Sequence, residues 1–479
     1  KYNPVTKVTF NGNLAAIGDY AFYKSRNLTE VTFKAVADPV GMTIGDYAFY
    51  RCNKLNVVTF EEEGAWSTTD SNIFEATKSC GVKSIGAHAF DSASITELKL
   101  PYSLNTLGEY AFANATALKS IDLANVSPIL TFGDYAFSMC RSLTAVELTK
   151  NVGTMNFNLV FYECTKLELT VSPDNPNYTV GEGGVLYNKD VTEIIYYPDS
   201  FEGVYELPES VTKISGAVFK GKNSMTSIVI SKNVVEIGDS AFEDCANLKS
   251  VTFAADGTDA LTIGAKAFYN CGSLKQIELP ARTTSIGDSC FSYDTFMDAS
   301  ARTLEKITLN EGLQTIGVKA FASTVQLTSI NIPSTVTSIG DSAFYYSAIG
   351  SITFAARNGK ELVFGASLFD GCSSLTKVEL PEGLVSIPAR TFYNNSALTS
   401  VTIPTTVRND NAERAIGQFA FYNCAKLSEV IFTKGGSESL SFAGGAFYGC
   451  DSLTKLSLPA RIASLDTSKF DVFELGTNG

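Results

Sequence analysis

Apolar residues recur in one fixed order along the whole chain of 479 residues. Residues 263–280 show this order: an isoleucine before a glycine, an Ala-Phe pair, a leucine six residues later, and two more apolar residues at alternate positions. Self-similarity at a fixed period is the signature of repeat architectures. The marker phenylalanine of the pattern occurs sixteen times, at Phe22, Phe49, Phe90, Phe112, Phe137, Phe161, Phe219, Phe242, Phe268, Phe291, Phe321, Phe344, Phe369, Phe392, Phe421 and Phe447.

A leucine six residues after most of these markers opens a run of the form L-x-x-[VIL]-x-[LIF], which has the period of two of a β-strand. In residues 375–380, Val378 and Leu380 face inward, while Lys377 and Glu379 face out. A single strand cannot bury its apolar face alone, so we expect one short strand per repeat, stacked in parallel with its neighbours. The Gly-Asp step before the Ala-Phe pair predicts a tight bend and a capped, short helical turn on the opposite side.

The phrase I-G-D-x-A-F-x-x-C-x-x-L-x-x-[VI]-x-[LF]-P resembles the BspA-type leucine-rich repeat of bacterial surface proteins. It occurs at residues 237–245 and, in shorter form, at 339–344. The resemblance covers almost the whole chain. It implies a repeat solenoid, either a horseshoe or a right-handed superhelix, that is rich in β-structure. A parallel β-sheet would form its concave face, and short helical turns and loops its convex face.

A solenoid grows without a size limit on its core, so we expect one domain over residues 1–479 with about sixteen or more turns. Two alternating runs predict a β-hairpin-like insertion at 172–200. Residues 459–479 lack another Ala-Phe pair and are expected to cap the last turn. Residues 61–83 either lengthen one turn or hide a degenerate turn around Ile73 and Phe74.

The formal net charge is −13, and basic residues form no cluster, which argues against nucleic-acid binding. No apolar run reaches the length of a membrane span, and the N-terminus has neither an initiator Met nor a signal-peptide pattern. We expect the chain to come from a precursor whose signal peptide has been removed. An extracellular or cell-surface monomer is the predicted state.

Eight of the ten cysteines lie three residues after a marker phenylalanine, where other repeats place Ser or Ala. Such a site suits a small buried side chain, so we predict free thiols rather than disulfides. Six aspartates share the position after the repeat glycine. A calcium ladder is the alternative to helix capping there, but other repeats carry Ala, Glu, Val or Gln at this position, which capping tolerates better.

Nothing in the sequence assembles a catalytic site, so we predict no enzyme and no cofactor or metal. His88 is the only histidine, and Ser-His-Asp or Cys-His chemistry would have to use it. Other repeats place Tyr20, Tyr135, Lys266 or Ser342 at its position. We therefore expect a solvated surface residue.

The outward positions of the predicted strands form the default binding surface of a solenoid. Our candidates there are Glu147, Gln276, Glu278, Lys306 and Lys377. The face is polar, so a partner would be bound through many weak contacts.

The insertion adds Tyr187, Tyr196 and Tyr197 as further candidates. They form either an exposed ligand platform or a packed structural hairpin. The resemblance implies an adhesion-type protein that binds a host or microbial protein. A glycan-binding or glycan-processing accessory protein is the alternative.

Overall fold

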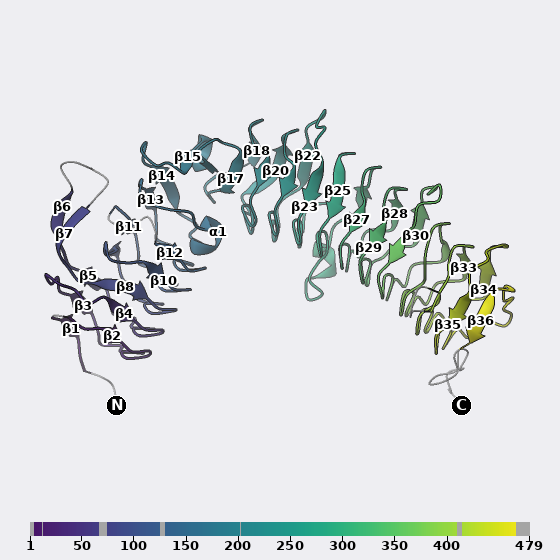
Figure 1. The fold of residues 1–479 in the computed structure, drawn as a ribbon, viewed down its shortest axis with the longest axis horizontal. Helices are drawn as coiled ribbons and strands as arrows, with labels where there is room; N and C mark the ends of the chain where they lie inside the picture. Colours follow the sequence, from purple (N-terminus) through teal and green to yellow (C-terminus); the bar gives the residue numbers. More distant parts are fainter. Residues whose placement is uncertain are drawn as a thin grey trace. The chain divides into compact units, whose positions relative to one another are not determined.

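The structure is a computed structural model that describes residues 4–11, 13–66, 74–124, 130–201, 203–409 and 414–465. The chain divides into two compact units, Lys1–Phe201 and Glu202–Gly479. Each unit is a stack of turns whose successive strands pair in parallel (Figure 1). The predicted fold class, a β-rich repeat solenoid, is confirmed. A single domain over residues 1–479 stays a prediction.

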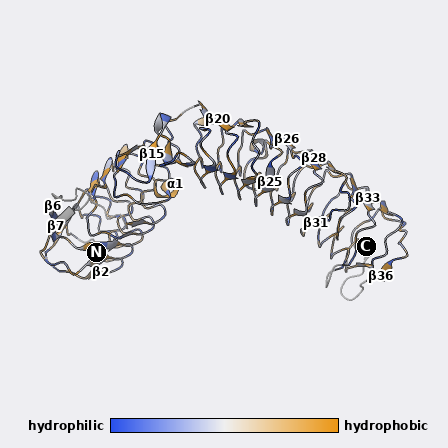
Figure 2. Cartoon of the chain, turned by 45° about the horizontal axis from the view of Figure 1, so that its top comes forward, coloured by the Kyte–Doolittle hydropathy of each residue, from blue (hydrophilic) through white to orange (hydrophobic). Residues whose placement is uncertain are grey.

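Series A contains the strands that follow the repeat leucine, and these are the predicted strands. Buried and exposed side chains alternate along them, as in β13, where Val146 and Leu148 are buried and Glu147 is exposed. Figure 2 shows hydrophilic and hydrophobic segments close together on the strands. In the first unit the series comprises β1 (Lys7–Phe10), β3 (Glu30–Phe33), β5 (Val57–Phe60), β9 (Glu97–Lys99), β11 (Ser120–Asp122), β13 (Ala145–Leu148) and β14 (Glu168–Val171). In the second unit it comprises β18 (Gly203–Glu206), β20 (Met225–Ile230), β22 (Ser250–Phe253), β24 (Gln276–Glu278), β26 (Lys306–Thr308), β28 (Ser329–Ile332), β30 (Ser351–Phe354), β32 (Lys377–Glu379), β33 (Ser400–Ile403) and β34 (Glu429–Phe432).

Series B is a second row of short strands, most of them just before the repeat glycine, and it corrects the prediction of one strand per turn. Most of these strands have only two to four residues, too few to show a period of two in the sequence. The first unit contributes β2 (Ala16–Ile17), β4 (Met42–Ile44), β8 (Val82–Ile85), β10 (Thr106–Leu107) and β12 (Thr131–Phe132). The second contributes β19 (Lys213–Ile214), β21 (Glu236–Ile237), β23 (Leu261–Ile263), β25 (Thr283–Ile286), β27 (Thr315–Ile316), β29 (Ser338–Ile339), β31 (Val363–Phe364), β35 (Leu440–Phe442) and β36 (Ile462–Leu465). Of the predicted cap at 459–479, β36 pairs in parallel with β35, and residues 466–479 lie outside the described part.

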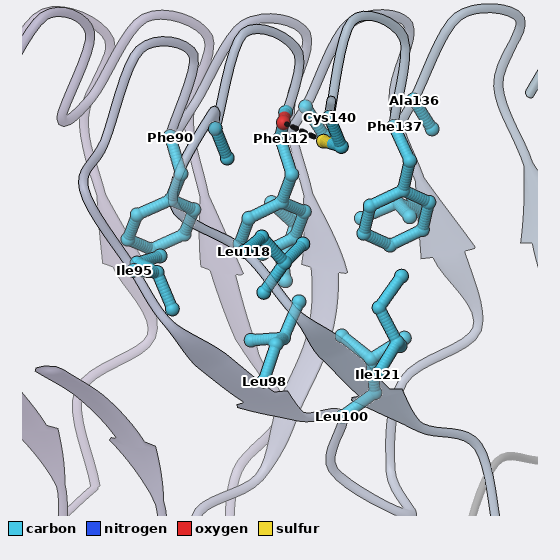
Figure 3. Packing of buried hydrophobic residues seen from close by; sticks show 14 of the residues in the cluster. Phe90, Ile95, Leu98, Leu100, Phe112, Leu118, Ile121, Ala136, Phe137 and Cys140 are labelled. Atoms are coloured by element: carbon cyan, nitrogen blue, oxygen red, sulfur yellow. Dashed lines mark hydrogen bonds between the residues drawn. The ribbon is translucent and has the colours of Figure 1, made fainter. Parts of the chain in front are cut away.

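The marker phenylalanines stack into a ladder through the core of each unit. Neighbouring ring centroids lie 5.0–5.8 Å apart from Phe22 to Phe161. They lie 4.7–5.6 Å apart from Phe219 to Phe447. Figure 3 shows three of these rings with aliphatic side chains of the adjoining strands beneath them. Offset-stacked rings add to the energy of burial, so each turn is fastened to its neighbours.

The turns around the marker phenylalanine contain left-handed residues and are therefore not helical, in contrast to the prediction. Around Phe268, Lys266 has φ 55° and Asn270 has φ 58°, and the positions two before and two after the marker recur with positive φ in most turns. A right-handed helix cannot continue through such residues. Among the described residues, the one α-helix is α1 (Phe157–Val160), beside the 3₁₀ turns η1 (Glu182–Gly184) and η2 (Ala299–Ala301).

The repeated aspartate links neighbouring turns, so the prediction that it caps its own turn is wrong. Oδ1 of Asp239 accepts the backbone N–H of Ala265, the residue at the same position of the next turn, at 2.7 Å. Asp46, Asp288 and Asp341 make the same contact at 2.7–2.8 Å. These bonds account for an aspartate at this position without a cation. Within the described ranges, no group of three or more His, Cys, Asp or Glu could hold a metal ion.

Residues 61–83 contribute a hairpin rather than an additional turn. Strand β6 (Glu62–Trp66) pairs antiparallel with β7 (Phe74–Ser79). Phe49 and Phe90 stack directly at 5.0 Å, and β4 pairs with β8. The turns on either side of the segment are therefore direct neighbours. Ile73, which was expected to mark a hidden turn, lies outside the described residues.

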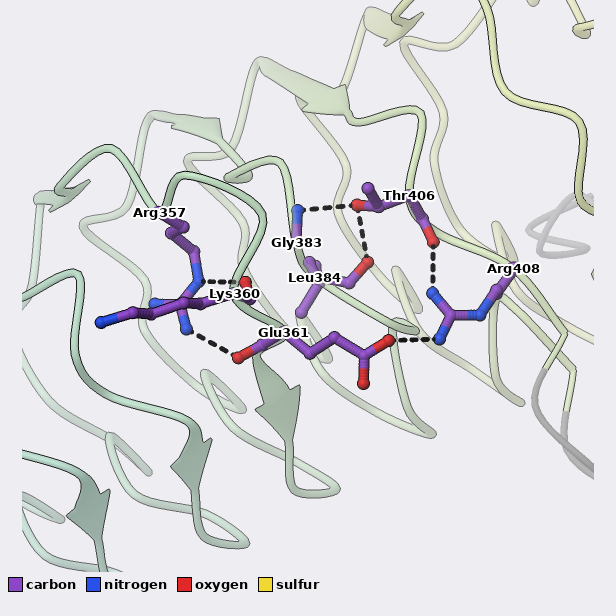
Figure 4. Close-up of polar contacts among 7 residues, drawn as sticks. All are labelled: Arg357, Lys360, Glu361, Gly383, Leu384, Thr406 and Arg408. Atoms are coloured by element: carbon purple, nitrogen blue, oxygen red, sulfur yellow. Dashed lines mark hydrogen bonds and ion pairs between the residues drawn. The ribbon is translucent and has the colours of Figure 1, made fainter.

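Arginines stabilise the corners of several turns in the second unit, and one of them, Arg357, is buried. Arg357 is 4 % exposed and donates from Nε to the carbonyl of Lys360 and from Nη2 to that of Glu361, at 3.1 and 2.7 Å (Figure 4). Burial lowers the pKa of the Arg357 guanidinium. The carboxylate of Glu361 in turn binds Nη2 of Arg408 at 2.6 Å. These bonds satisfy corner carbonyls that no strand partner reaches.

Candidate binding surface

Three of the predicted binding residues meet on adjacent series A strands of the second unit. In β24, Ile277 is buried, whereas Gln276 and Glu278 are exposed. In β26, Ile307 is buried and Lys306 is exposed. The parallel register sets Gln276 opposite Lys306, with Glu278 two residues further along the same strand. An amide, a carboxylate and an ammonium group therefore share one outward face.

These side chains line an open groove of about 670 Å³. Its other walls come from β22 and from the corners that follow the three strands. Ser250, Thr252 and Asn310 add hydroxyl and amide groups, and Phe253 is the one aromatic residue in the lining. The groove thus offers many hydrogen-bonding groups and more polar than apolar surface. Such a surface suits an extended ligand held through distributed contacts.

The other two predicted strand residues are exposed but lie away from this groove. Lys377 on β32 forms an ion pair with Glu379 of the same strand, with 2.8 Å between Nζ and Oε1. Its hydrogen bond to Glu379 raises the pKa of Lys377. Glu147 lies on β13 of the first unit. A separate groove in that unit, of about 550 Å³, lies over β5, β9 and β11.

The three predicted tyrosines are buried, which favours the packed structural hairpin over the exposed ligand platform. Tyr187 is 4 % exposed, Tyr196 2 % and Tyr197 0 %. Burial raises the pKa of Tyr196 well above its ordinary value. Rings in such positions contribute to packing and present no face to a ligand.

The insertion that carries these tyrosines is a three-stranded antiparallel meander of β15 (Tyr178–Val180), β16 (Leu186–Asn188) and β17 (Glu193–Tyr196). Buried Asn175 anchors its start. The Asn175 amide donates to the carbonyl of Thr149 at 2.8 Å, and Oδ1 accepts the N–H groups of Asn177 and Tyr178. This geometry favours the structural interpretation of the insertion, with three paired strands where the sequence analysis expected a hairpin.

Another aromatic surface, in the first unit, was missed by the sequence analysis. Tyr20 stacks on Tyr47, with 5.0 Å between centroids, and Tyr23 stacks on Tyr50 at 5.3 Å. Tyr20 is 56 % exposed and Tyr23 39 %. The sequence signal was the repeated D-Y-A-F-Y at residues 19–23 and 46–50. Tyr47 has stacked rings on both faces, whereas Tyr20, at the end of the stack, has a stacked ring on one face only.

His88 continues this stack, which corrects the prediction of a solvated residue. Its ring lies between Tyr47 and Tyr110, with 4.7 Å between centroids on each side. Nδ1 lies 2.8 Å from Oδ2 of buried Asp91. The stacking covers both faces of the imidazole. This arrangement suits a structural role better than proton transfer to a substrate.

The family model for the BspA type leucine rich repeat region matches this chain over residues 1–82, 83–206, 192–301, 293–413 and 410–477. The matches span nearly the whole sequence. No curated protein sequence matches the chain.

Several solved structures are similar to the chain. A leucine-rich cell surface protein from Faecalibacterium prausnitzii is 16 % identical, with 90 % of this chain and 89 % of that one covered and a TM-score of 0.34. The pneumococcal vaccine antigen PcpA is 18 % identical, with 90 % and 93 % covered and a TM-score of 0.42. A leucine-rich repeat protein from Bacteroides ovatus is 21 % identical, with 84 % and 88 % covered and a TM-score of 0.38.

Proposed function

Since this chain belongs to the BspA-type leucine-rich repeat family, we propose that it is a non-catalytic interaction protein that works outside the cell or at its surface. Its ligand is a host or microbial protein, which it binds through the solenoid surface in an adhesion role. The observation that carries this proposal is the shared outward face of Gln276, Glu278 and Lys306. Mixed charges and amides on one rigid sheet favour a specific polar partner.

Two features of the described residues support a non-catalytic role. The only histidine is enclosed between two tyrosine rings. Burial raises the pKa of Cys245 and of Cys372 to about 12, so these two thiols supply little thiolate near neutral pH. No helix among the described residues is long and apolar enough to span a bilayer.

The proposal is tested with a variant that reverses the charges in the groove, Glu278→Lys with Lys306→Glu. Lys377→Glu with Glu379→Lys is the matched control, because that pair lies on the same series of strands outside the groove. Both variants keep the net charge, and all four side chains are exposed. Binding to immobilised fibronectin, laminin, fibrinogen and mucin is measured by biolayer interferometry.

We expect the wild-type chain to bind at least one of these proteins. Reversal in the groove should weaken binding by about tenfold or more, as expected when about 1.4 kcal/mol is lost, while the control stays unchanged. Equal binding by all variants would show that the groove is not the site. Selective binding to an array of defined oligosaccharides, without protein binding, would favour the glycan alternative, for which the hydroxyl and amide groups of the groove are suited.

A further inference from the structure

One side chain of the second unit is exposed far beyond the rest. Phe296 is 96 % exposed, whereas the next most exposed large hydrophobic residue among those described, Val204, is 60 % exposed. Phe296 lies in an extended loop at residues 292–303, between the marker Phe291 and strand β26. This loop protrudes beyond the neighbouring turns (Figure 1).

The guanidinium of Arg302 fixes the backbone on both sides of Phe296. Nη2 donates to the carbonyl of Thr295 at 2.7 Å and to that of Met297 at 2.6 Å, and Nε donates to the carbonyl of Met297 at 3.1 Å. The N–H of Phe296 itself donates to Oδ1 of Asp294 at 2.9 Å. These bonds therefore fix the backbone from which the Phe296 side chain projects outward.

Hydrogen bonds hold both ends of the loop, either to neighbouring turns or between residues of the loop itself. At its start, Tyr293 is buried, and its hydroxyl accepts the N–H of Leu304 at 3.1 Å. The N–H of Asp294 donates to Oδ1 of Asn270, one turn earlier, at 2.8 Å. Towards its end, Asp298 accepts the N–H and hydroxyl of Ser300. A loop backbone fixed in this way loses little conformational freedom on binding, which favours affinity.

The surroundings of Phe296 are acidic. Asp294 and Asp298 lie two residues to either side of it, and the charge of Arg302 is directed inward at the loop carbonyls. Burial raises the pKa of Tyr269, and the negative charges of Asp294, Asp244 and Glu243 raise it further. An anionic membrane surface is repelled by such a site, whereas a basic protein surface is attracted.

We propose that Phe296 is an anchor that inserts into an apolar pocket bordered by basic side chains on a protein partner. This inference rests on the proposed function, because it assumes that the ligand is a protein. An aromatic residue in a preorganised position is the usual centre of a binding hot spot, and its acidic neighbours would set orientation and association rate.

Four variants test the anchor. Phe296→Ser removes it, and Phe296→Trp keeps an aromatic ring. Asp294→Asn with Asp298→Asn removes the charges but keeps the oxygen acceptors that hold the loop. Tyr346→Ser is the matched control, because Tyr346 is an aromatic residue of the same unit and is 51 % exposed. Binding of the full chain to immobilised fibronectin, laminin, fibrinogen and mucin is measured at two salt concentrations, together with thermal stability.

We expect Phe296→Ser to weaken binding by about tenfold or more without changing thermal stability, and Phe296→Trp to restore most of it. The double Asn variant should bind more slowly and with less dependence on salt. Tyr346→Ser should bind as the wild type does. If the wild-type chain binds and Phe296→Ser binds equally well, the anchor is overturned while the proposed function stands.

Other outcomes also decide against the anchor. Absence of wild-type binding to every protein overturns the proposed function and this inference with it. Binding to phosphatidylcholine vesicles that depends on Phe296 would show that the loop inserts into lipid. Self-association in sedimentation that Phe296→Ser abolishes would show that the pocket belongs to a second copy of this chain.

Discussion

The thiol of Cys245 donates a hydrogen bond to the backbone carbonyl of Phe219, one turn earlier, with 2.9 Å between Sγ and O. The same bond joins each of the other repeat cysteines to the preceding marker phenylalanine, at 3.0–3.4 Å. Figure 3 shows it between Cys140 and Phe112. Asn395 replaces the thiol in one turn and donates to the carbonyl of Phe369 at 2.7 Å. The position therefore favours a compact donor that links one turn to the next, although Ala93 and Ala115 occupy it in two turns.

All ten cysteines are free and buried, as predicted for the repeat positions. Burial raises the pKa of Cys245 and Cys372 to about 12. Because only the thiolate reacts quickly, we expect iodoacetamide at pH 8 to leave both cysteines of the folded protein unmodified. After denaturation without reductant, mass spectrometry should find all ten alkylated. Fast modification of Cys245 in the folded chain would contradict its burial.

The fold could be predicted because its core positions repeat. Each marker phenylalanine and each repeat leucine meets an equivalent residue one turn away, so the same apolar pattern had to recur along the chain. Series B could not be predicted, since a pair such as Thr315 and Ile316 is too short to carry a period. The residues with left-handed backbone conformation were not predicted either, because Lys266 and Tyr47 are not residue types that favour a positive φ.

The binding residues were predicted less well than the fold. Alternation along the strands identified Gln276, Glu278 and Lys306 as outward, because each neighbours an inward isoleucine. For the insertion, tyrosine content did not reveal orientation, and Tyr196 proved to be buried. Phe296 lies in a loop whose conformation is held by hydrogen bonds from Arg302 to the carbonyls of Thr295 and Met297. These bonds involve backbone carbonyls, which every residue type has, so the sequence carries no pattern that predicts them.

Phe268 lies in the middle of the ladder of the second unit, with Phe242 at 5.0 Å and Phe291 at 5.3 Å. Phe268→Ala should lower the free energy of unfolding by about 3–5 kcal/mol, because it removes a buried ring and leaves a cavity. In a repeat stack the loss should be local. Hydrogen exchange should quicken around residues 242–292 and stay unchanged in the first unit. Unchanged exchange around Phe268 would refute its role as an anchor of the ladder.

Glu62 at the base of the first hairpin should make stability depend on pH. Burial raises its pKa above the ordinary value of 4.5, although Oε1 accepts hydrogen bonds from Ser79 and Cys80. The folded state therefore binds the proton more tightly than the unfolded state does. The contribution of Glu62 to the free energy of unfolding should be greatest below pH 4.5. It should fall as the pH rises through the pKa of Glu62 in the folded state.

Glu62→Gln should remove this dependence on pH and raise the melting temperature at pH 7. Glu63→Gln is the matched control, because Glu63 is exposed and pairs with Lys78. Thermal melts between pH 4 and pH 8 would measure both variants. A Glu62→Gln variant that melts with the same pH profile as the wild type would show that Glu62 is not the group responsible.

Substitution of Lys319 by glycine tests whether the residues with positive φ in the turns destabilise the folded state through backbone strain. It lies two residues before the marker Phe321 with φ 54°, where a side chain costs about 1–2 kcal/mol. Gly445 occupies the equivalent position before Phe447 with φ 68°, so the turn accepts glycine. Lys319→Gly should raise the free energy of unfolding by about 0.5–1 kcal/mol, since the relief of strain exceeds the added entropy of the unfolded chain. Ala320→Gly, at the next residue, lacks this relief and should be destabilising. Denaturant unfolding of both variants gives the sign, and equal destabilisation would show that the turn carries no strain at Lys319.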